Sequence, residues 1–320
     1  MKIVVLDGYT LNPGDHSWAP VQNAAPEGAG FTVYPRTTPN QVLERSQGAQ
    51  VLLTNKTVLT ANHFTKLPEL KLILILATGV NAVDLKAAAA RNICVCNVPE
   101  YGTHSVAQFV FAQILQLAHR SALHDKRVRE GKWEECGEFC FWETPQIELR
   151  GLTLGILGFG RIGRAVAKLG NAFGMQVIAH SPRFNEGTEL ARAVSLDALF
   201  AESHILTLHC SLNANNQHIV SRQTLDKMRP DAFLINTARG GLICESDLIG
   251  ALESKRLAGA ALDVCETEPM SSTDPLLAAP NLHLTPHMAW GSLRARERLM
   301  ATTGANLAAW LSGRPTCQVA

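Results

Sequence analysis

The sequence has no excess of charge of either sign. Its 29 Lys and Arg residues stand against 28 Asp and Glu residues, which leaves a net charge of +1. No block of like charge runs long enough to form a basic or acidic tail. The chain therefore lacks the electrostatic signature of proteins that bind nucleic acid or membrane surfaces, and we expect neither as a partner.

Long apolar runs are also missing. The longest, Leu72 to Ala77, is far shorter than the roughly 20 residues that a membrane-spanning helix needs. The apolar start at Ile3 ends at Asp7 without a small-residue cleavage site, which does not fit a secretory signal peptide. These absences predict a cytoplasmic protein.

The eight cysteines never form a C-x-x-C pair and are scattered over 320 residues. Such scatter excludes the dense disulfide framework of small secreted domains and predicts reduced, buried thiols. A zinc site from Cys136, Cys140 and a histidine such as His124 fits the composition, but the paired ligand spacing of zinc sites is absent. We expect no metal.

Short runs rich in Val, Ile and Leu alternate with segments of helical length. This pattern is typical of βαβ units whose parallel sheets are buried on both faces. It predicts an α/β fold with two sheets, and the length suits about two domains. The expected strands are 2–6, 31–34, 50–54, 71–77, 93–97, 152–157, 176–180, 204–209, 232–237, 258–264 and 282–285.

A helix is expected over 103–128, with apolar side chains on two opposite faces. Such a helix must be covered on both faces, by the two domains of one chain or by a second subunit. We favour a homodimer through 103–145. The end of that region, 131–145, holds two tryptophans without a helical period and predicts an ordered excursion. A last helix over 293–311 is expected to return to the first domain.

The clearest local motif is GFGRIGR at 158–164, which follows an apolar strand and opens a helix. Gly158 permits a tight turn, Gly160 lets the backbone approach a pyrophosphate, and Gly163 allows the helix to pack closely on the strand. With Arg161 and Ile162, these glycines are candidate dinucleotide-binding residues. The alternative is a set of glycines that serves helix packing alone.

The end of the next strand normally distinguishes NAD from NADP, because a carboxylate there accepts a hydrogen bond from the ribose 2′-hydroxyl and repels a 2′-phosphate. This chain has no acid there. It has Ser181 and Arg183, which suit a 2′-phosphate and favour NADP(H) over NAD(H). Alternatively, Arg183 stacks on the adenine, which would fit either cofactor.

Three polar residues follow expected strands in the second half, where open α/β sheets gather their ligands. Arg239 precedes Glu268 by 29 residues, and Glu268 precedes His287 by 19. A lone arginine or histidine is more often structural than catalytic, so the evidence lies in their order and spacing.

At this point the sequence resembles the D-isomer-specific 2-hydroxyacid dehydrogenases, and within them the glycerate dehydrogenase or hydroxypyruvate reductase group. The resemblance covers essentially the whole chain. It implies two Rossmann-like or flavodoxin-like parallel-sheet domains, with the cofactor domain inserted in the substrate domain. The matching motifs are ATGVNAVDL at 77–85, NVPEYGTHSVAQ at 97–108, GFGRIGR at 158–164, INTARGG at 235–241, ALDVCETEP at 261–269 and LTPH at 284–287.

The resemblance implies a role for each of the three polar residues. His287 would donate a proton during reduction and accept one during oxidation, since a histidine titrates near neutral pH. Glu268 would hold the imidazole in one tautomer and favour its charged form. Arg239 would bind the substrate carboxylate and polarise the keto oxygen.

The resemblance also suggests cofactor contacts by Asp263, His209 and Thr237. Asp263 matches the position that binds the nicotinamide carboxamide, or it caps a turn. His209 matches a position that lines the cofactor, or it is a buried, hydrogen-bonded histidine. Thr237 lies in the INTARGG motif.

Four further residues are candidates for the substrate site. Backbone N–H groups of Gly79 and Val80 would bind the other face of the carboxylate. Lys56 would pair with the same group, or is a surface lysine. Trp142 would reach the partner subunit's active site, or packs in the subunit interface.

Together these observations predict a substrate domain of 1–98 with 289–320, a Rossmann cofactor domain of 99–288, and NAD(P)(H) as cofactor. The predicted reaction reduces hydroxypyruvate or glyoxylate to D-glycerate or glycolate. Two alternatives stay open: an NAD(H)-sensing interaction protein without turnover, and the same chemistry on another acid such as formate, phosphoglycerate or phosphonate.

Overall fold

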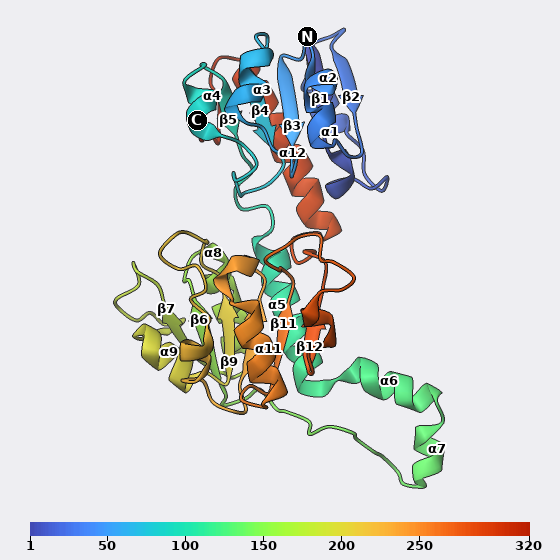
Figure 1. Ribbon diagram of the computed structural model, residues 1–320, viewed down its shortest axis with the longest axis vertical. Helices are drawn as coiled ribbons and strands as arrows, with labels where there is room; N and C mark the ends of the chain where they lie inside the picture. The colour runs from blue at the N-terminus through green and yellow to red at the C-terminus, as the bar shows by residue number, and fades with distance from the viewer. The chain divides into compact units, whose positions relative to one another are not determined.

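The computed structural model describes residues 1–320 and divides them into two compact units (Figure 1). The first unit contains Met1–Gly102 and Gly291–Ala320, and the second contains Thr103–Trp290. The bounds expected from the sequence, 1–98 with 289–320 and 99–288, differ from these by a few residues. None of the helices combines the length and the apolar character needed to cross a membrane.

The first unit is built on a sheet of five parallel strands in the order β2-β1-β3-β4-β5. This is the doubly wound order of flavodoxin-like folds. Both faces of the sheet are covered, so every residue of the inner strands β3 and β4 is buried. The strands are β1 (Lys2–Val5), β2 (Gly30–Val33), β3 (Val51–Thr54), β4 (Leu72–Ile75) and β5 (Cys94–Cys96).

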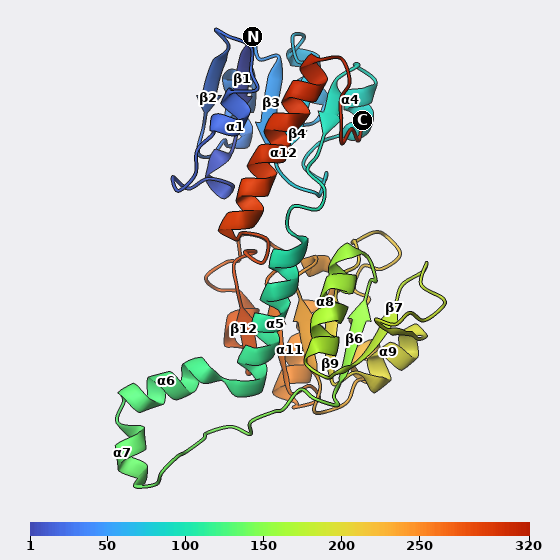
Figure 2. The ribbon, with the colours of Figure 1, turned by 180° about the vertical axis from the view of Figure 1, so that it is seen from behind.

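Helices cover this sheet on both faces. In Figure 2, α12 (Leu293–Leu311) runs across the sheet on the face that also carries α1 (Ala19–Gln22). The predicted last helix is thus present with the expected bounds and lies in the first unit. The remaining helices are α2 (Val42–Ser46), α3 (Ala61–Lys66), α4 (Leu85–Ala89) and the short 3₁₀ helices η1 (Gly8–Thr10) and η2 (Pro39–Gln41).

The second unit holds seven parallel strands in the order β12-β11-β10-β9-β6-β7-β8. The winding reverses between β6 and β9, and ligands bind at such a switch point, beyond the carboxyl ends of the strands. The sequence missed β8, which has only two residues and no apolar run. The strands are β6 (Thr153–Leu157), β7 (Gln176–His180), β8 (Arg192–Ala193), β9 (Ile205–Leu208), β10 (Phe233–Asn236), β11 (Gly259–Leu262) and β12 (Leu282–Leu284).

Two apolar cores lie on opposite faces of this sheet. Side chains alternate along each strand, so Ile156 enters one core and Leu157 the other. Figure 2 shows α5 and α8 over the first core, and Figure 1 shows α9 and α11 over the second. The helices are α5 (Thr103–His119), α8 (Arg161–Ala172), α9 (Leu196–Glu202), α10 (Arg222–Leu225), α11 (Glu245–Glu253) and the 3₁₀ helices η3 (Gly240–Leu242) and η4 (Pro275–Ala278).

The prediction of one helix over 103–128 is wrong. Arg120 adopts a left-handed backbone with φ +46°, which ends α5 and separates it from α6 (Ser121–Arg129). No residue of α6 is buried, because its sequence has few apolar side chains to dock on a core. Together with α7 (Lys132–Cys136) and the segment 137–145 that follows it, α6 forms an arm that stands away from the sheet of its own unit in Figure 1.

All eight cysteines are free thiols. Only Cys96 is fully buried, and Cys140 on the arm is exposed. The expectation of buried thiols is therefore confirmed for Cys96 alone. Six other cysteines are half-buried, and Cys140 is exposed because the arm carries it away from any core.

Packing in the first unit generates a matched pair of substitutions. Gly304, inside α12, lies so close to α1 that an added Cβ would stand 2.2 Å from the carbonyl oxygen of Pro20. Gly250, inside α11, has nothing within 4 Å of that position. We expect Gly304→Ala to lower the free energy of unfolding by about 1–3 kcal/mol through overpacking. Gly250→Ala should raise it by about 0.5–1 kcal/mol, because alanine is the better helix former.

Thermal unfolding of the two variants beside the parent chain measures this contrast. Equal midpoints for Gly304→Ala and the parent would contradict the close approach of α12 to α1.

Candidate active site

The glycine-rich turn between β6 and α8 has the geometry of a phosphate-binding turn. Gly158 has φ +98°, and a Cβ there would lie 2.5 Å from the backbone nitrogen of Cys210. A Cβ on Gly163 would lie 2.3 Å from the carbonyl oxygen of Gly158, so the helix begins in close contact with the turn. Gly160 differs, since nothing lies within 4 Å of its Cβ position. The turn thus leaves open space at its middle glycine.

The residues around this turn fit a dinucleotide. The first N–H groups of a helix have no partner within it, and they present a positive dipole end to an anion. Ile162 is half-buried and packs against the apolar core, while Arg161 is exposed at the start of α8. The hydroxyl of Thr237, after β10, is buried without a hydrogen-bond partner. An unsatisfied buried hydroxyl of this kind is a donor and acceptor available to a ligand.

A tight turn follows β7, at the strand end that distinguishes the two nicotinamide cofactors. The backbone N–H of Phe184 donates to the carbonyl oxygen of Ser181 over 2.9 Å, which places Arg183 at the exposed tip. The ring of Phe184 packs on that of Phe159 with centroids 4.3 Å apart. A hydroxyl and a guanidinium therefore stand at this strand end, and no carboxylate takes part in the turn.

His209 directly follows β9, beside the switch point. A Cβ on Gly158 would lie 2.6 Å from the carbonyl carbon of His209, so the two backbones touch. The ring Nε2 lies 2.9 Å from the hydroxyl oxygen of Thr207. Burial lowers the pKa of His209, which keeps the ring neutral. These contacts fit a hydrogen-bonded histidine in the wall of the predicted cofactor site.

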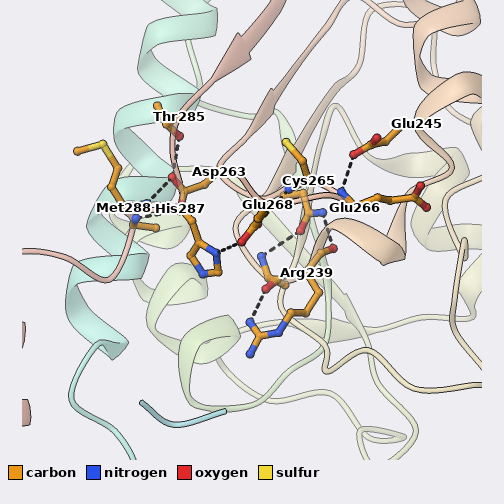
Figure 3. Close-up of polar contacts among 12 residues, drawn as sticks. Arg239, Glu245, Asp263, Cys265, Glu266, Glu268, Thr285, His287 and Met288 are labelled. Atoms are coloured by element: carbon orange, nitrogen blue, oxygen red, sulfur yellow. Dashed lines mark hydrogen bonds and ion pairs between the residues drawn. The ribbon is translucent and has the colours of Figure 1, made fainter. Parts of the chain in front are cut away.

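His287 and Glu268 form a hydrogen-bonded pair (Figure 3). The imidazole Nδ1 is 2.7 Å from Oε2 of Glu268, and the two side chains are 25% and 35% exposed. The other carboxylate oxygen of Glu268 accepts from the backbone N–H of Cys265 over 3.2 Å. The carboxylate therefore fixes the ring through Nδ1 and leaves Nε2 as the nitrogen that can meet a ligand.

The loop that carries His287 is tied to Asp263, which follows β11 and is 2% exposed. Its carboxylate accepts hydrogen bonds from the hydroxyl of Thr285 (2.7 Å) and from the backbone N–H groups of Met288 (2.9 Å) and Ala289 (2.8 Å). Burial raises the pKa of Asp263, while these hydrogen bonds oppose the rise. His287 itself has φ +51°. These contacts are those of the turn cap left open as the alternative role of Asp263.

Arg239 lies at the start of η3, and its guanidinium is exposed. The fully buried side chain of Asn236 fixes this turn, because it donates to the carbonyl oxygen of Arg239 over 2.8 Å and accepts from the N–H of Ala238 over 3.0 Å. Figure 3 shows the guanidinium grouped with the side chains of Glu268 and His287. The three residues, far apart in sequence, thus gather at the carboxyl ends of β10, β11 and β12.

Sequence reasoning missed Asn236. An asparagine at the last position of a strand, directly before the Thr-Ala-Arg turn, was the available signal, since its side chain commonly bonds the backbone two or three residues on.

The remaining candidates lie elsewhere. Lys56 is exposed on the loop after β3, and its backbone N–H donates to Asp7 over 2.6 Å. Gly79 and Val80 follow β4 and are half-buried. These three belong to the first unit. Trp142 lies on the arm of the second unit with 64% of its surface exposed.

Comparisons with known proteins agree with this architecture. Residues 111–289 match the family model of the D-isomer specific 2-hydroxyacid dehydrogenase NAD binding domain. A hydroxypyruvate reductase of Blautia hydrogenotrophica is 42% identical over 98% of both chains. A glycerate dehydrogenase of Methylorubrum extorquens is 36% identical over 87% of this chain and 88% of its own. The solved structure of an acyclic imino acid reductase in complex with NADPH and D-Arg superposes with a TM-score of 0.86, at 29% identity over all of both chains.

The fold and the site thus define an oxidoreductase that uses a nicotinamide cofactor. Its parts are two parallel-sheet units, a glycine-rich turn at the switch point and a histidine–glutamate pair beside an arginine. The chain belongs to the D-isomer specific 2-hydroxyacid dehydrogenase family. This confirms the family, the fold class and the enzyme class predicted from the sequence motifs.

The open space at Gly160 gives a test of the cofactor turn. Because a methyl group fits there in the free protein, we expect Gly160→Ala to leave the thermal midpoint unchanged. The methyl group would occupy the approach to the pyrophosphate, so the dissociation constant for the reduced nicotinamide should rise about tenfold or more. Fluorescence titration with NADH and NADPH measures it.

Gly163→Ala is the contrasting control, because its Cβ would clash with the turn itself and lower the thermal midpoint. Native cofactor affinity in Gly160→Ala would refute pyrophosphate binding at this turn.

Proposed function

We propose that this protein reduces hydroxypyruvate or glyoxylate to D-glycerate or glycolate. The observation that carries the proposal is the 2.7 Å contact of His287 with Glu268 on loops beside Arg239. Two relatives, named hydroxypyruvate reductase and glycerate dehydrogenase, support this choice among 2-keto acids. The second unit takes the cofactor, and the first unit takes part in substrate binding.

His287 supplies the proton in this proposal. A nicotinamide cofactor held at the glycine-rich turn of Gly158, Gly160 and Gly163 would supply the hydride for C2 of the keto acid, and negative charge would then develop on the keto oxygen. Nδ1 is held by Glu268, so Nε2 donates the proton to that oxygen. The carboxylate keeps the ring oriented before and after the transfer. In the oxidative direction the same nitrogen takes the hydroxyl proton.

Arg239 binds and polarises the substrate. Its planar fork suits a carboxylate and the adjacent keto oxygen, and a fixed cation stabilises charge that develops on that oxygen. Asn236 holds the turn from which the guanidinium extends. Backbone N–H groups of Gly79 and Val80 and the ammonium of Lys56 take the remaining carboxylate contacts. Trp142 acts at the active site of a partner subunit.

NADP(H) is the favoured cofactor. Arg183 at the tip of the turn after β7, with Ser181 at its base, offers a cation and a hydroxyl to a 2′-phosphate. Asp263, His209 and Thr237 complete the cofactor site in this proposal. The unsatisfied hydroxyl of Thr237 supports its part.

The protein acts as a cytoplasmic homodimer in this proposal. Its arm and α5 form the interface, through 103–145. Large apolar side chains exposed on the arm support a covering partner. They are Val128, Trp133, Phe139 and Trp142.

His287→Ala and Arg239→Ala test the assigned roles. Each should lower kcat/KM by about two to four orders of magnitude, because the proton donor or the fixed cation is lost. Cofactor affinity and thermal midpoint should stay near those of the parent. Absorbance of NADPH or NADH, followed with a panel of 2-keto acids, measures turnover.

Arg222→Ala is the matched control, since Arg222 is exposed at the start of α10 and pairs with Asp247, which has no role in the proposed site. Near-native turnover in either test variant would overturn its role. No turnover of any 2-keto acid by the parent would favour a cofactor sensor.

Arg183→Ala tests the cofactor choice. If the guanidinium binds the 2′-phosphate, KM for NADPH should rise about tenfold to a hundredfold while KM for NADH changes little. If Arg183 stacks on the adenine instead, both constants rise together. Parallel steady-state kinetics with the two cofactors separate these results.

A further inference from the structure

A second histidine–glutamate pair lies outside the machinery described above. His218, in the loop after β9, contacts the carboxylate of Glu266 through Nε2, and the two side chains are 40% and 38% exposed. Glu266 is two residues before Glu268 on the loop after β11. The pair therefore joins the loop that starts at His209 to the loop that holds the carboxylate of Glu268.

The loops of Arg239 and Glu268 touch through their backbones. A Cβ on Gly240 would lie 1.9 Å from the carbonyl carbon of Cys265 and 2.4 Å from the nitrogen of Glu266. No side chain fits between them. A small shift of either loop therefore changes the position of the guanidinium relative to the carboxylate.

His218 is bound to both loops at once. Its backbone N–H donates to the carbonyl oxygen of Gly241 over 2.9 Å, next to the Arg239 turn. Its ring holds Glu266 on the other loop. The residue has φ +53°, a conformation that persists in non-glycine residues only where the surroundings enforce it. Its backbone and its ring thus act on opposite sides of the contact at Gly240.

A third contact holds the same loop, from the side of α11. The backbone N–H of Glu266 donates to Oε1 of Glu245, the first residue of α11, over 2.7 Å (Figure 3). Burial raises the pKa of Glu245, and the nearby carboxylates of Glu266 and Asp274 add to the rise. Several acids therefore crowd this loop. His218 contacts one of them through Nε2.

We propose that His218 and Glu266 are positioning residues that hold Arg239 and the Glu268–His287 pair in their working arrangement. The inference rests on the proposed function for its kinetic consequences, but not for its structural ones. Neither residue needs to touch substrate, since both act through the two loops that meet at Gly240. Asn236 holds one of these loops in place, whereas His218 and Glu266 hold the two loops together.

Two conservative variants test the proposal. His218→Asn keeps a residue that tolerates the left-handed backbone but is too short to reach Glu266. Glu266→Gln keeps the size of the side chain and removes its charge. Lys227→Ala is the control, because it breaks another ion pair of this unit, Lys227 with Asp197 at 2.6 Å, away from the site.

Hydrogen exchange in the free protein gives a readout that needs no substrate. We expect faster exchange in 239–243 and 265–268 in both test variants and not in Lys227→Ala. Without the His218–Glu266 contact the loop moves more freely, and the amides of Cys265 and Glu266 separate more often from their acceptors on Glu268 and Glu245. We also expect kcat/KM for the keto acid to fall about tenfold, since small misplacements of reacting groups are costly, while the dissociation constant for the cofactor stays unchanged.

Unchanged exchange in both segments would overturn the proposal. So would faster exchange with native kcat/KM, or a loss of cofactor affinity equal to the loss of kcat/KM, which indicates general loosening of the unit. If the parent chain turns over no 2-keto acid, the proposed function fails, and the exchange result alone decides the positioning proposal.

Discussion

One buried carboxylate, that of Asp263, sets the geometry on which the active site depends. Thr285, Met288 and Ala289, in the loop after β12, each donate a hydrogen bond to it. His287 lies between them in the chain, with φ +51°. Placing a charge there is costly, as the raised pKa of Asp263 indicates. An uncharged side chain would lack enough acceptors for two backbone N–H groups and a hydroxyl. The cost of burial is thus offset by the order it gives to the loop that carries His287, the proposed proton donor.

The sequence predicted the parts of the fold that follow from period and composition. Buried parallel strands are short continuous apolar runs, so β3, β4 and β10 could be predicted from the sequence. Arg239, Glu268 and His287 also follow expected strands whose carboxyl ends share one edge of the sheet, but their predicted roles came from the resemblance of the surrounding motifs to a known family. The break of the helix at Arg120 was not predictable in this way. Its neighbours on both sides favour helix, and the left-handed turn is visible only in the backbone.

The residues that hold the loops in place could not be predicted from the sequence, for a different reason. Asn236, Glu266 and His218 are polar residues in loops, where most polar residues only meet water. Their role comes from partners 3 to 48 positions away, and no local pattern encodes such distances. Asp263 shows the same limit, because its family role concerns a cofactor while its contacts in the free protein are with its own chain.

In the first unit another acid holds a loop in place in the same way as Asp263. Asp7, just beyond β1, accepts hydrogen bonds from the backbone N–H groups of Asn55 (2.8 Å), Lys56 (2.6 Å) and Thr57 (2.6 Å). That loop follows β3, the neighbour of β1, just as the loop clamped by Asp263 follows β12, the neighbour of β11. In a parallel sheet, neighbouring strands release their loops at the same edge. An acid past one strand can therefore collect the free N–H groups of the loop beside it. The same arrangement in both sheets ties candidate ligand-binding loops to rigid strands, which is what a reaction that depends on exact placement of a proton donor requires.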